Sequence, residues 1–181
     1  MSDTATIPNA TITRAVGDAP HETAALIDHI LARYHETHRR ELPELVQLAR
    51  KVEAVHADHA AVPRGLSDLL HRILGEIEVH MKKEELILFP AMRRGIGNLA
   101  MPIAQMRHDH DDHDAQLHAA EQLTDGFRPP HDACGSWRAL YQRTAKFADD
   151  FAAHVHLEND VLFPRFEQPV APQGQTEGHL P

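Results

Sequence analysis

The sequence predicts an all-α protein, folded as one antiparallel up-down four-helix bundle. Three observations predict it. Long stretches of good helix formers carry apolar residues three or four positions apart, segments rich in proline and glycine separate them, and no useful length alternates with period two. The length of 181 residues suits one domain with a sizeable core. We expect the bundle to span 21–166, between a flexible arm at 1–20 and a disordered tail at 167–181.

The first predicted helix begins near His21 and ends near His56. Leucine and valine side chains recur along it at helical spacing. Pro43 lies inside this stretch, so we expect a kink or a local break there, because proline removes a backbone donor and crowds the preceding turn. The segment ADHAAVPRG, 57–65, is the turn that follows.

The other three helices are predicted at about 66–90, 100–123 and 133–164. The turn RRGIGN separates the second helix from the third, and the turn TDGFRPPHD separates the third from the fourth. The second and fourth helices each run into a proline, which we expect to end them. Four long helices with short connections favour antiparallel neighbours around one core.

The composition excludes several classes of protein. With 18 basic against 27 acidic residues the net charge is -9, which argues against a nucleic-acid binder. No apolar run is long enough to cross a membrane, and the N-terminus lacks a signal-peptide pattern. The single cysteine excludes an internal disulfide and fits a reducing compartment, so we expect a cytoplasmic protein. The 16 histidines direct attention to metal sites.

Two segments of the chain repeat one motif. HMKKEELILFP, 80–90, and HVHLENDVLFP, 154–164, both read H-x-x-x-E followed three residues later by L-F-P. A histidine and a glutamate four apart stand on one helix face, one turn above the other. An imidazole nitrogen and a carboxylate oxygen can therefore reach one metal ion.

A further histidine precedes each motif at almost the same distance. His35 lies 45 residues before His80, and His110 lies 44 before His154. In an antiparallel hairpin, two residues share a height when the turn lies midway between them. The two midpoints fall near residues 57 and 132, inside or beside the predicted turns. Each hairpin should therefore bring its two histidines level.

The two halves together supply four imidazoles and two carboxylates at one end of the core. Such sets on facing helices build di-iron and di-manganese sites. Two glutamates can bridge two metals, and two histidines per metal leave coordination positions open. Iron is favoured, with manganese or zinc as alternatives. We expect two carboxylate-bridged, non-haem iron ions per chain. The predicted ligands are His35, His80, Glu84, His110, His154 and Glu158.

The pattern resembles the hemerythrin-like family, most closely its branch of iron-centre repair proteins, which are linked to nitric oxide. The likeness covers about 21–166, and the family's metal ligands match the six predicted ones. The segments that carry the likeness are RYHETHR (33–39), KVEAVHADH (51–59), HMKKEELILFP (80–90), AMPIAQMRHDHDDHD (100–114) and HVHLENDVLFP (154–164).

The chain also departs from the family pattern. Oxygen-carrying hemerythrins have an H-x-x-x-H pair in the third helix, but the residues four before and after His110 are Met106 and Asp114. That difference argues against reversible oxygen carriage. Iron-repair proteins typically add an N-terminal domain with a cysteine pair. The chain lacks this domain and pair, so any thiol-assisted chemistry would have to come from a partner.

The resemblance implies a role in the response to nitrosative and oxidative stress. The protein would bind nitric oxide at open iron positions, supply iron to damaged iron–sulfur clusters, or both. The alternative is a di-iron sensor or scavenger of nitric oxide or O2 without a role in repair, and reduction of nitric oxide at the two irons is a third possibility. The partners implied are nitric oxide or O2 and apo iron–sulfur proteins.

Four other residues needed separate interpretations. His56 would lie about 31 Å from His35 along a straight helix, so we interpret it as a capping or surface residue unless Pro43 folds the helix back. His38 and His113 each follow a predicted ligand by three residues. We interpret both as surface histidines, and the alternatives are a residue that supports a ligand or an extra ligand. Cys134 lies near a loop with no base expected beside it.

Overall fold

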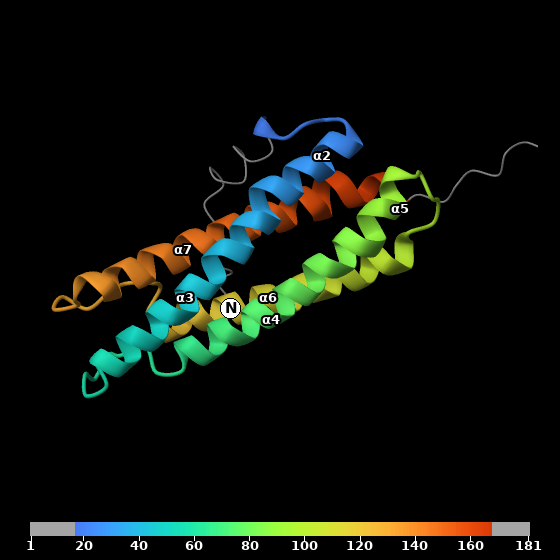
Figure 1. Cartoon of the computed structure of the whole chain (residues 1–181). Coiled ribbons are helices and arrows are strands. Elements are labelled where there is room, and N and C mark those ends of the chain that lie inside the picture. The colour runs from blue at the N-terminus through green and yellow to red at the C-terminus, as the bar shows by residue number, and fades with distance from the viewer. Residues whose placement is uncertain (1–16, 168–181) are drawn as a thin grey trace, which may run out of the picture.

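The structure is a computed structural model that describes residues 17–167. Within that range every regular element is a helix and no strand occurs, which confirms the all-α prediction (Figure 1). Most of the predicted arm at 1–20 and all but the first residue of the predicted tail at 167–181 lie outside the described residues. The domain limits, including 21–166 for the bundle, therefore stay a prediction.

The chain forms four long helical rods, and three of them contain a turn that departs from α geometry. The label η marks such turns. The first rod consists of α2 (Thr23–Ile30), η1 (Leu31–His35) and α3 (Glu36–Val55). The second consists of α4 (Leu66–Lys83), η2 (Glu84–Leu88) and α5 (Phe89–Arg93). The third is α6 (Ala100–Leu123), and the fourth consists of α7 (Gly135–His156), η3 (Leu157–Leu162) and η4 (Phe163–Arg165).

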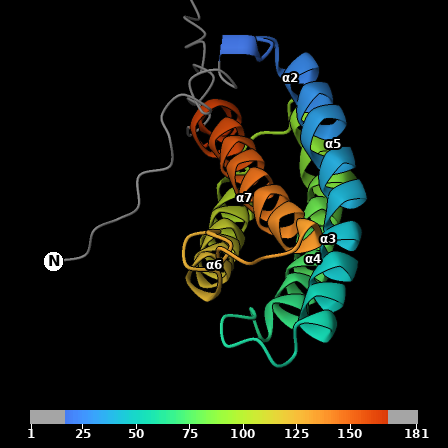
Figure 2. The same ribbon diagram turned by 90° about the vertical axis from the view of Figure 1, so that its left-hand side faces the viewer.

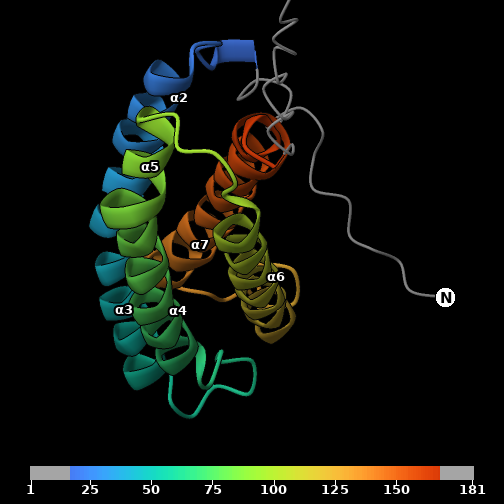
Figure 3. The ribbon, with the colours of Figure 1, turned by 90° about the vertical axis from the view of Figure 1, so that its right-hand side faces the viewer.

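The four rods pack as two antiparallel hairpins. Helix α3 contacts both α4 and α7, and α6 contacts both α4 and α7. Figures 2 and 3 show α3 and α4 on one side of the bundle and α6 and α7 on the other. The α3–α4 loop and the α6–α7 loop lie at the same end (Figure 1). This arrangement confirms the predicted bundle and makes the two halves of the internal repeat face each other.

The prolines disturb the helices less than the sequence suggested. Helix α3 continues through Pro43 without a break. Pro90 and Pro164 do not end their helices either, because each stands in the first turn of the next helical segment, α5 or η4. A first-turn residue has no intrahelical partner for its backbone N–H, so proline is tolerated there.

Three π-helical turns are the irregular points of the bundle. They are η1, η2 and η3, and each interrupts a rod whose other residues are mainly α-helical. In a π turn the backbone bonds span five residues instead of four, so the turn holds an extra residue. Such turns are rare and occur mostly at functional sites. All three lie in the half of the bundle away from the two hairpin loops.

The buried core consists of two apolar clusters. One cluster lies toward the hairpin loops and includes Leu70 and Phe147. The other lies toward the π turns and includes Ile27 and Phe163. Along the first three rods, buried histidine or glutamate residues separate the members of the two clusters, and on the fourth rod His154 and Glu158 lie where the second cluster begins. A polar layer therefore divides the core.

Local features support the ends of the rods. Glu22 accepts a hydrogen bond from the backbone N–H of Ala25 and caps α2. Gly65 precedes α4 with a φ of 89°, a left-handed conformation that favours glycine. Glu53 of α3 accepts bonds from the backbone and hydroxyl of Ser67, which ties α3 to the start of α4. Within residues 17–167 no helix is both long and apolar enough to cross a membrane.

Candidate metal centre

Six buried side chains meet in the polar layer, and they are the six predicted ligands. None is more than 2% exposed. Their donor atoms form two groups of four, and within each group all donor atoms lie within 4.8 Å of one another. Both glutamates belong to both groups. The first group is His35, Glu84, His154 and Glu158, and the second is His80, Glu84, His110 and Glu158.

The imidazoles meet in two pairs through their Nε2 atoms. The Nε2 atoms of His35 and His154 are 3.2 Å apart, and those of His80 and His110 are 3.0 Å apart. Each pair takes one ring from the α3–α4 hairpin and one from the α6–α7 hairpin. Neither pair can form before the two hairpins dock.

The two carboxylates lie between the imidazole pairs. One oxygen of Glu84 is 3.4 Å from Nε2 of His35, and its other oxygen is 3.4 Å from Nε2 of His80. Glu158 repeats this arrangement toward the histidines of α7 and α6, at 3.0 and 3.1 Å. Each carboxylate therefore presents one oxygen to each pair, which is the arrangement of a bridging carboxylate.

The π turns coincide with the candidate ligands. His35 is the last residue of η1, Glu84 is the first residue of η2, and Glu158 lies in η3. In the two H-x-x-x-E motifs the histidine lies in the last turn of an α-helix, and the glutamate is the first or second residue of the wider turn. Sequence reasoning placed these residues on regular helices and did not predict the wider turns.

Three of the four imidazoles have a side-chain partner at Nδ1, the ring nitrogen that faces away from the centre of the cluster. His35 donates from Nδ1 to Glu85 at 2.8 Å, and His110 donates from Nδ1 to the side-chain oxygen of Asn159 at 3.0 Å. His80 points Nδ1 toward Asp109 at 3.4 Å. Such bonds place the hydrogen on Nδ1 and leave Nε2 free to face the centre.

Cations neutralise two of these outer carboxylates. Arg39 donates two bonds to Glu85 and one to Glu78. Lys83 donates to Asp109 at 2.8 Å. Burial raises the pKa of Asp109, but Lys83 and the neighbouring amide outweigh burial and lower that pKa to about 2. The contacts of these two carboxylates with the imidazoles both join different rods, so helical spacing alone does not predict them.

The metal-free cluster holds protons. Burial lowers the pKa of His35, but the carboxylates of Glu158 and Glu84 outweigh it and raise that pKa to about 10. The same balance raises the pKa of His80 to about 9. Burial alone would raise the pKa of Glu158, yet the surrounding imidazoles keep it well below its usual range. The two buried carboxylates thus favour the imidazolium form of His35 and His80 when no cation is bound.

The donor set fits a pair of cations. Both oxygens of Glu84 and one oxygen of Glu158 are buried without a hydrogen-bond partner. Two Nε2 atoms 3.0–3.2 Å apart can be satisfied only by a shared proton or by a cation. Neutral imidazoles and carboxylates together suit iron, manganese and zinc. A buried carboxylate that no donor satisfies is costly unless a cation is bound.

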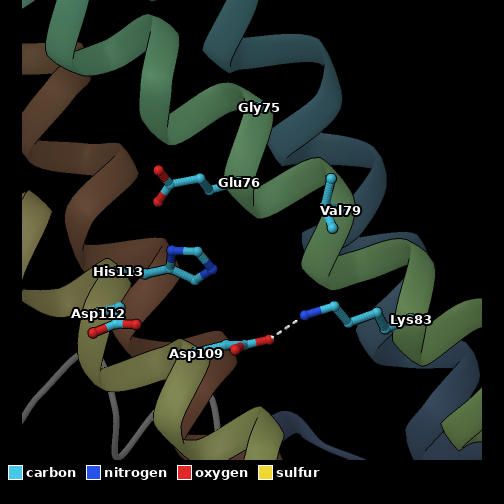
Figure 4. Close-up of a pocket in the computed structure, with 7 residues that line it drawn as sticks. All are labelled: Gly75, Glu76, Val79, Lys83, Asp109, Asp112 and His113. Carbon is cyan, nitrogen blue, oxygen red and sulfur yellow. Dashed lines mark hydrogen bonds and ion pairs between the residues drawn. The ribbon is translucent and has the colours of Figure 1, made fainter.

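A surface pocket of about 420 Å³ lies between α4 and α6 (Figure 4). Its lining includes Asp109, which contacts His80, and Lys83, which pairs with Asp109. His113 also lines it and projects between the two helices. The outer support of one candidate ligand is therefore the wall of a pocket.

His38 and His113 lie beside the cluster but belong to neither donor group. Both are buried, so the interpretation as surface histidines is wrong. Burial lowers the pKa of His38 well below its usual value and lowers the pKa of His113 to about 4. Both rings are therefore neutral at physiological pH.

His56 lies at the opposite end of the bundle, as expected. It caps the C-terminus of α3 through a backbone bond to Val52. Its ring, however, places Nε2 3.1 Å from the sulfur of Cys134 and packs against Trp137. The expectation that no base lies beside Cys134 was therefore wrong, because residues 78 positions apart meet where the two loops pack together.

Comparison with known proteins agrees with this geometry. Three curated relatives bear the name iron-sulfur cluster repair protein YtfE. They come from Musicola paradisiaca, Enterobacter sp. and Pectobacterium atrosepticum, and they are 49%, 50% and 48% identical to this chain over 141, 141 and 143 residues. The matches cover 77–78% of this chain but only 64–65% of the relatives. The chain therefore spans less than two thirds of their length.

A family model shows where the chain belongs. The model of the hemerythrin HHE cation binding domain matches residues 26–166, which include all six candidate ligands and all of the four rods except the first three residues of α2. The match and the shared level of identity agree with the resemblance inferred from the repeated motifs. The chain is thus a member of the hemerythrin HHE cation binding domain family.

Proposed function

We propose that this chain is a di-iron protein of the nitrosative and oxidative stress response that binds nitric oxide, supplies iron for the repair of damaged iron–sulfur clusters, or does both. One observation carries the proposal: six buried donors form two groups that share both glutamates. The family and the printed name of the relatives support it. The six residues would hold two irons, one in each group.

Iron at these positions would supply open coordination sites for a small ligand and a change of oxidation state. The residues of the chain prepare the site for it. Glu84 and Glu158 offer one oxygen to each position, and Glu85 and Asn159 fix the rings of His35 and His110. The imidazoles thus need little reorganisation when a metal arrives.

The proton content of the cluster supports the supply of iron. When a cation leaves, His35 and His80 take up protons, because the two carboxylates raise the pKa of each imidazole. The charge of Glu84 and Glu158 then stays neutralised inside the core. Exchange of cations for protons would let the protein release iron without leaving buried negative charge unbalanced.

Two measurements test the proposal. Metal analysis of the purified chain should find about two irons per chain, and His80→Leu or Glu158→Leu should lower that content. Iron-loaded protein should then transfer iron to an apo iron–sulfur protein in the presence of added sulfide and a thiol reductant, measured by recovery of the cluster's visible absorption. Metal-free protein from iron-rich expression would refute the di-iron proposal.

The transfer assay also separates the alternatives. Reversible binding of nitric oxide or O2 without transfer would identify a sensor or scavenger that has no role in repair. Nitrous oxide formed over many turnovers would identify an enzyme that reduces nitric oxide. Apo iron–sulfur proteins would be the partners in repair, and we propose that the chain acts in the cytoplasm.

A further inference from the structure

Two buried histidines repeat the internal symmetry but lie outside the donor groups. His38 follows His35 by three residues, and His113 follows His110 by three. The segments HETH and HDDH thus extend the repeat by one histidine each. Both residues lie one helical turn closer to the apolar cluster near the loops than the candidate ligand that precedes them.

The rings of His38 and His113 lie on the side of the donor cluster that faces the hairpin loops, and we call these two rings the floor. The ring of His38 lies 5.3 Å from that of His154, and the ring of His113 lies 5.3 Å from that of His80. Phe151 packs against both, at 5.9 and 5.8 Å. Each half of the donor cluster therefore has one imidazole against it from the same side.

All four ring nitrogens of this floor lack a hydrogen-bond partner among residues 17–167. His38 is fully buried and His113 is 4% exposed. A neutral imidazole carries one N–H in either tautomer, and burying a polar group without a partner is costly. A leucine or a phenylalanine would pack against Phe147 and Phe151 in place of His38 without that cost. The doubled use of histidine points to a partner that the protein itself does not supply.

We propose that His38 and His113 donate hydrogen bonds to a small ligand held at the metal centre and favour ligands with a terminal oxygen or nitrogen acceptor. The proposal rests on the proposed function and assigns the recognition of the ligand to this floor. The ligand class is a diatomic or linear triatomic molecule such as nitric oxide, O2 or azide. Carbon monoxide, a poor hydrogen-bond acceptor, would gain little from the floor.

The geometry argues against a role as extra metal ligands. The donor atoms of the six candidate ligands already complete two groups, and neither group includes a nitrogen of His38 or His113. Tyr34, Phe147 and Phe151 pack against the ring of His38 and hold it in place. A floor of fixed donors acts on what the metal binds rather than on the metal.

Azide is the probe for the test. Azide is added to the iron-loaded, oxidised full chain, and its dissociation constant is read from the visible absorption band. The azide stretching frequency is compared in H2O and D2O. His38→Leu and His113→Leu should each raise the dissociation constant about tenfold, the value expected for one lost hydrogen bond, and should reduce the D2O shift.

Variants that keep a donor sharpen the test. His38→Gln and His113→Gln retain a side-chain N–H and should restore most of the affinity and of the D2O shift. His38→Phe keeps a ring of similar size without nitrogens and replaces the leucine variant if that one does not fold. His108→Leu is the matched control, because this exposed histidine lies on α6 only five residues from His113.

Two outcomes would overturn the floor proposal. Variants with normal iron content and unchanged azide binding and D2O shift would show that the floor only packs or holds a water molecule. Loss of iron in the leucine variants, without rescue by glutamine, would show that these histidines are ligands. If the unmodified chain holds no iron or binds neither azide nor nitric oxide, the proposed function fails first, and this proposal fails with it.

Discussion

The two hairpins contribute equal numbers of candidate ligands but support them differently. In the α3–α4 hairpin, His35 and His80 face the carboxylates of Glu85 and Asp109, and a cation neutralises each carboxylate. In the α6–α7 hairpin, the partner of His110 is a neutral amide. His154 has no Nδ1 partner at all.

Ring stacking supports an imidazole of the second hairpin, whereas charged partners support the imidazoles of the first. The ring of His154 stacks on Tyr34 at 5.3 Å with the planes 8° apart. Burial also lowers the pKa of His154, whereas the pKa of His35 is raised to about 10. Each imidazole pair combines one ring from each hairpin, so each candidate metal position has one charge-supported ring and one ring without such support. A carboxylate partner makes an imidazole more basic and a stronger ligand.

The largest expected effect comes from substituting the two glutamates that belong to both donor groups. Glu84→Gln and Glu158→Gln should lower the iron content to below one per chain and by similar amounts, because each carboxylate reaches both positions. Metal analysis after purification in iron-rich medium measures this. Glu36→Gln is the control, because this exposed carboxylate lies next to His35 in the sequence but belongs to neither donor group. A glutamine variant that keeps two irons would contradict the bridging assignment.

The next effect tests the difference between the hairpins. Glu85→Ala should weaken iron binding by about 10- to 100-fold, because it removes a charged partner from a ligand imidazole. Asn159→Ala removes only a neutral amide and should weaken it less. Competition with a chelator measures both affinities. Equal losses in the two variants would show that charge support is not what distinguishes the hairpins.

The third effect concerns the metal-free protein and pH. The pKa values of His35 and His80 are raised in the folded state to about 10 and 9. Protonation of these rings therefore stabilises the fold fully below their unfolded pKa of about 6.5, and that stability is lost as pH rises toward 10. The slope should reach about 1.4 kcal/mol per pH unit for each histidine.

Urea unfolding of metal-free protein between pH 6 and 10 measures this slope. The control is the metal-free double variant His35→Gln with His80→Gln, which should lose most of it. Iron-loaded protein should show the opposite trend, because protons compete with iron and the affinity for iron rises with pH. A flat stability profile for metal-free protein would contradict the assignment of buried imidazolium groups.

The smallest expected effect comes from a substitution that gives the α6–α7 hairpin a charged partner like those of the α3–α4 hairpin. Asn159→Asp gives His110 a charged partner, and Arg107, which already donates to the backbone oxygen of residue 159, lies close enough to neutralise it. We expect a few-fold tighter binding of iron, measured by the same chelator competition. Asn159→Leu should move the affinity in the opposite direction. A weaker site in the aspartate variant would mean that desolvation of the new charge exceeds its benefit.

The repeat made much of this molecule predictable. Two H-x-x-x-E motifs and two histidines at matching distances were enough to place six residues in one layer, because helical spacing and hairpin geometry are regular. The contacts of the residues that support the imidazoles could not be predicted from spacing. Asn159 and Glu85 stand next to ligands in sequence, but their contacts depend on rods that pack across the bundle.

Other features required the three-dimensional structure. Pro90 and Pro164 were expected to end their helices, yet each stands in the first turn of a further helical segment after a π turn. His56 and Cys134 meet only where the two loops pack together. No local pattern in the sequence specifies a π turn, because its cost is balanced by tertiary contacts at the site rather than by propensity.

The π turns make the centre sensitive to residue count. An α-helix turns about 100° per residue, so the extra residue in each π turn sets the direction of every side chain beyond it. Deleting one residue from η2 or η3 would restore a regular helix and rotate the following Leu-Phe-Pro segment away from the core that now buries its phenylalanine. The geometry of the site therefore depends on the number of residues in the π turns as well as on their identity. An insertion or deletion in these turns would be more damaging than most substitutions there.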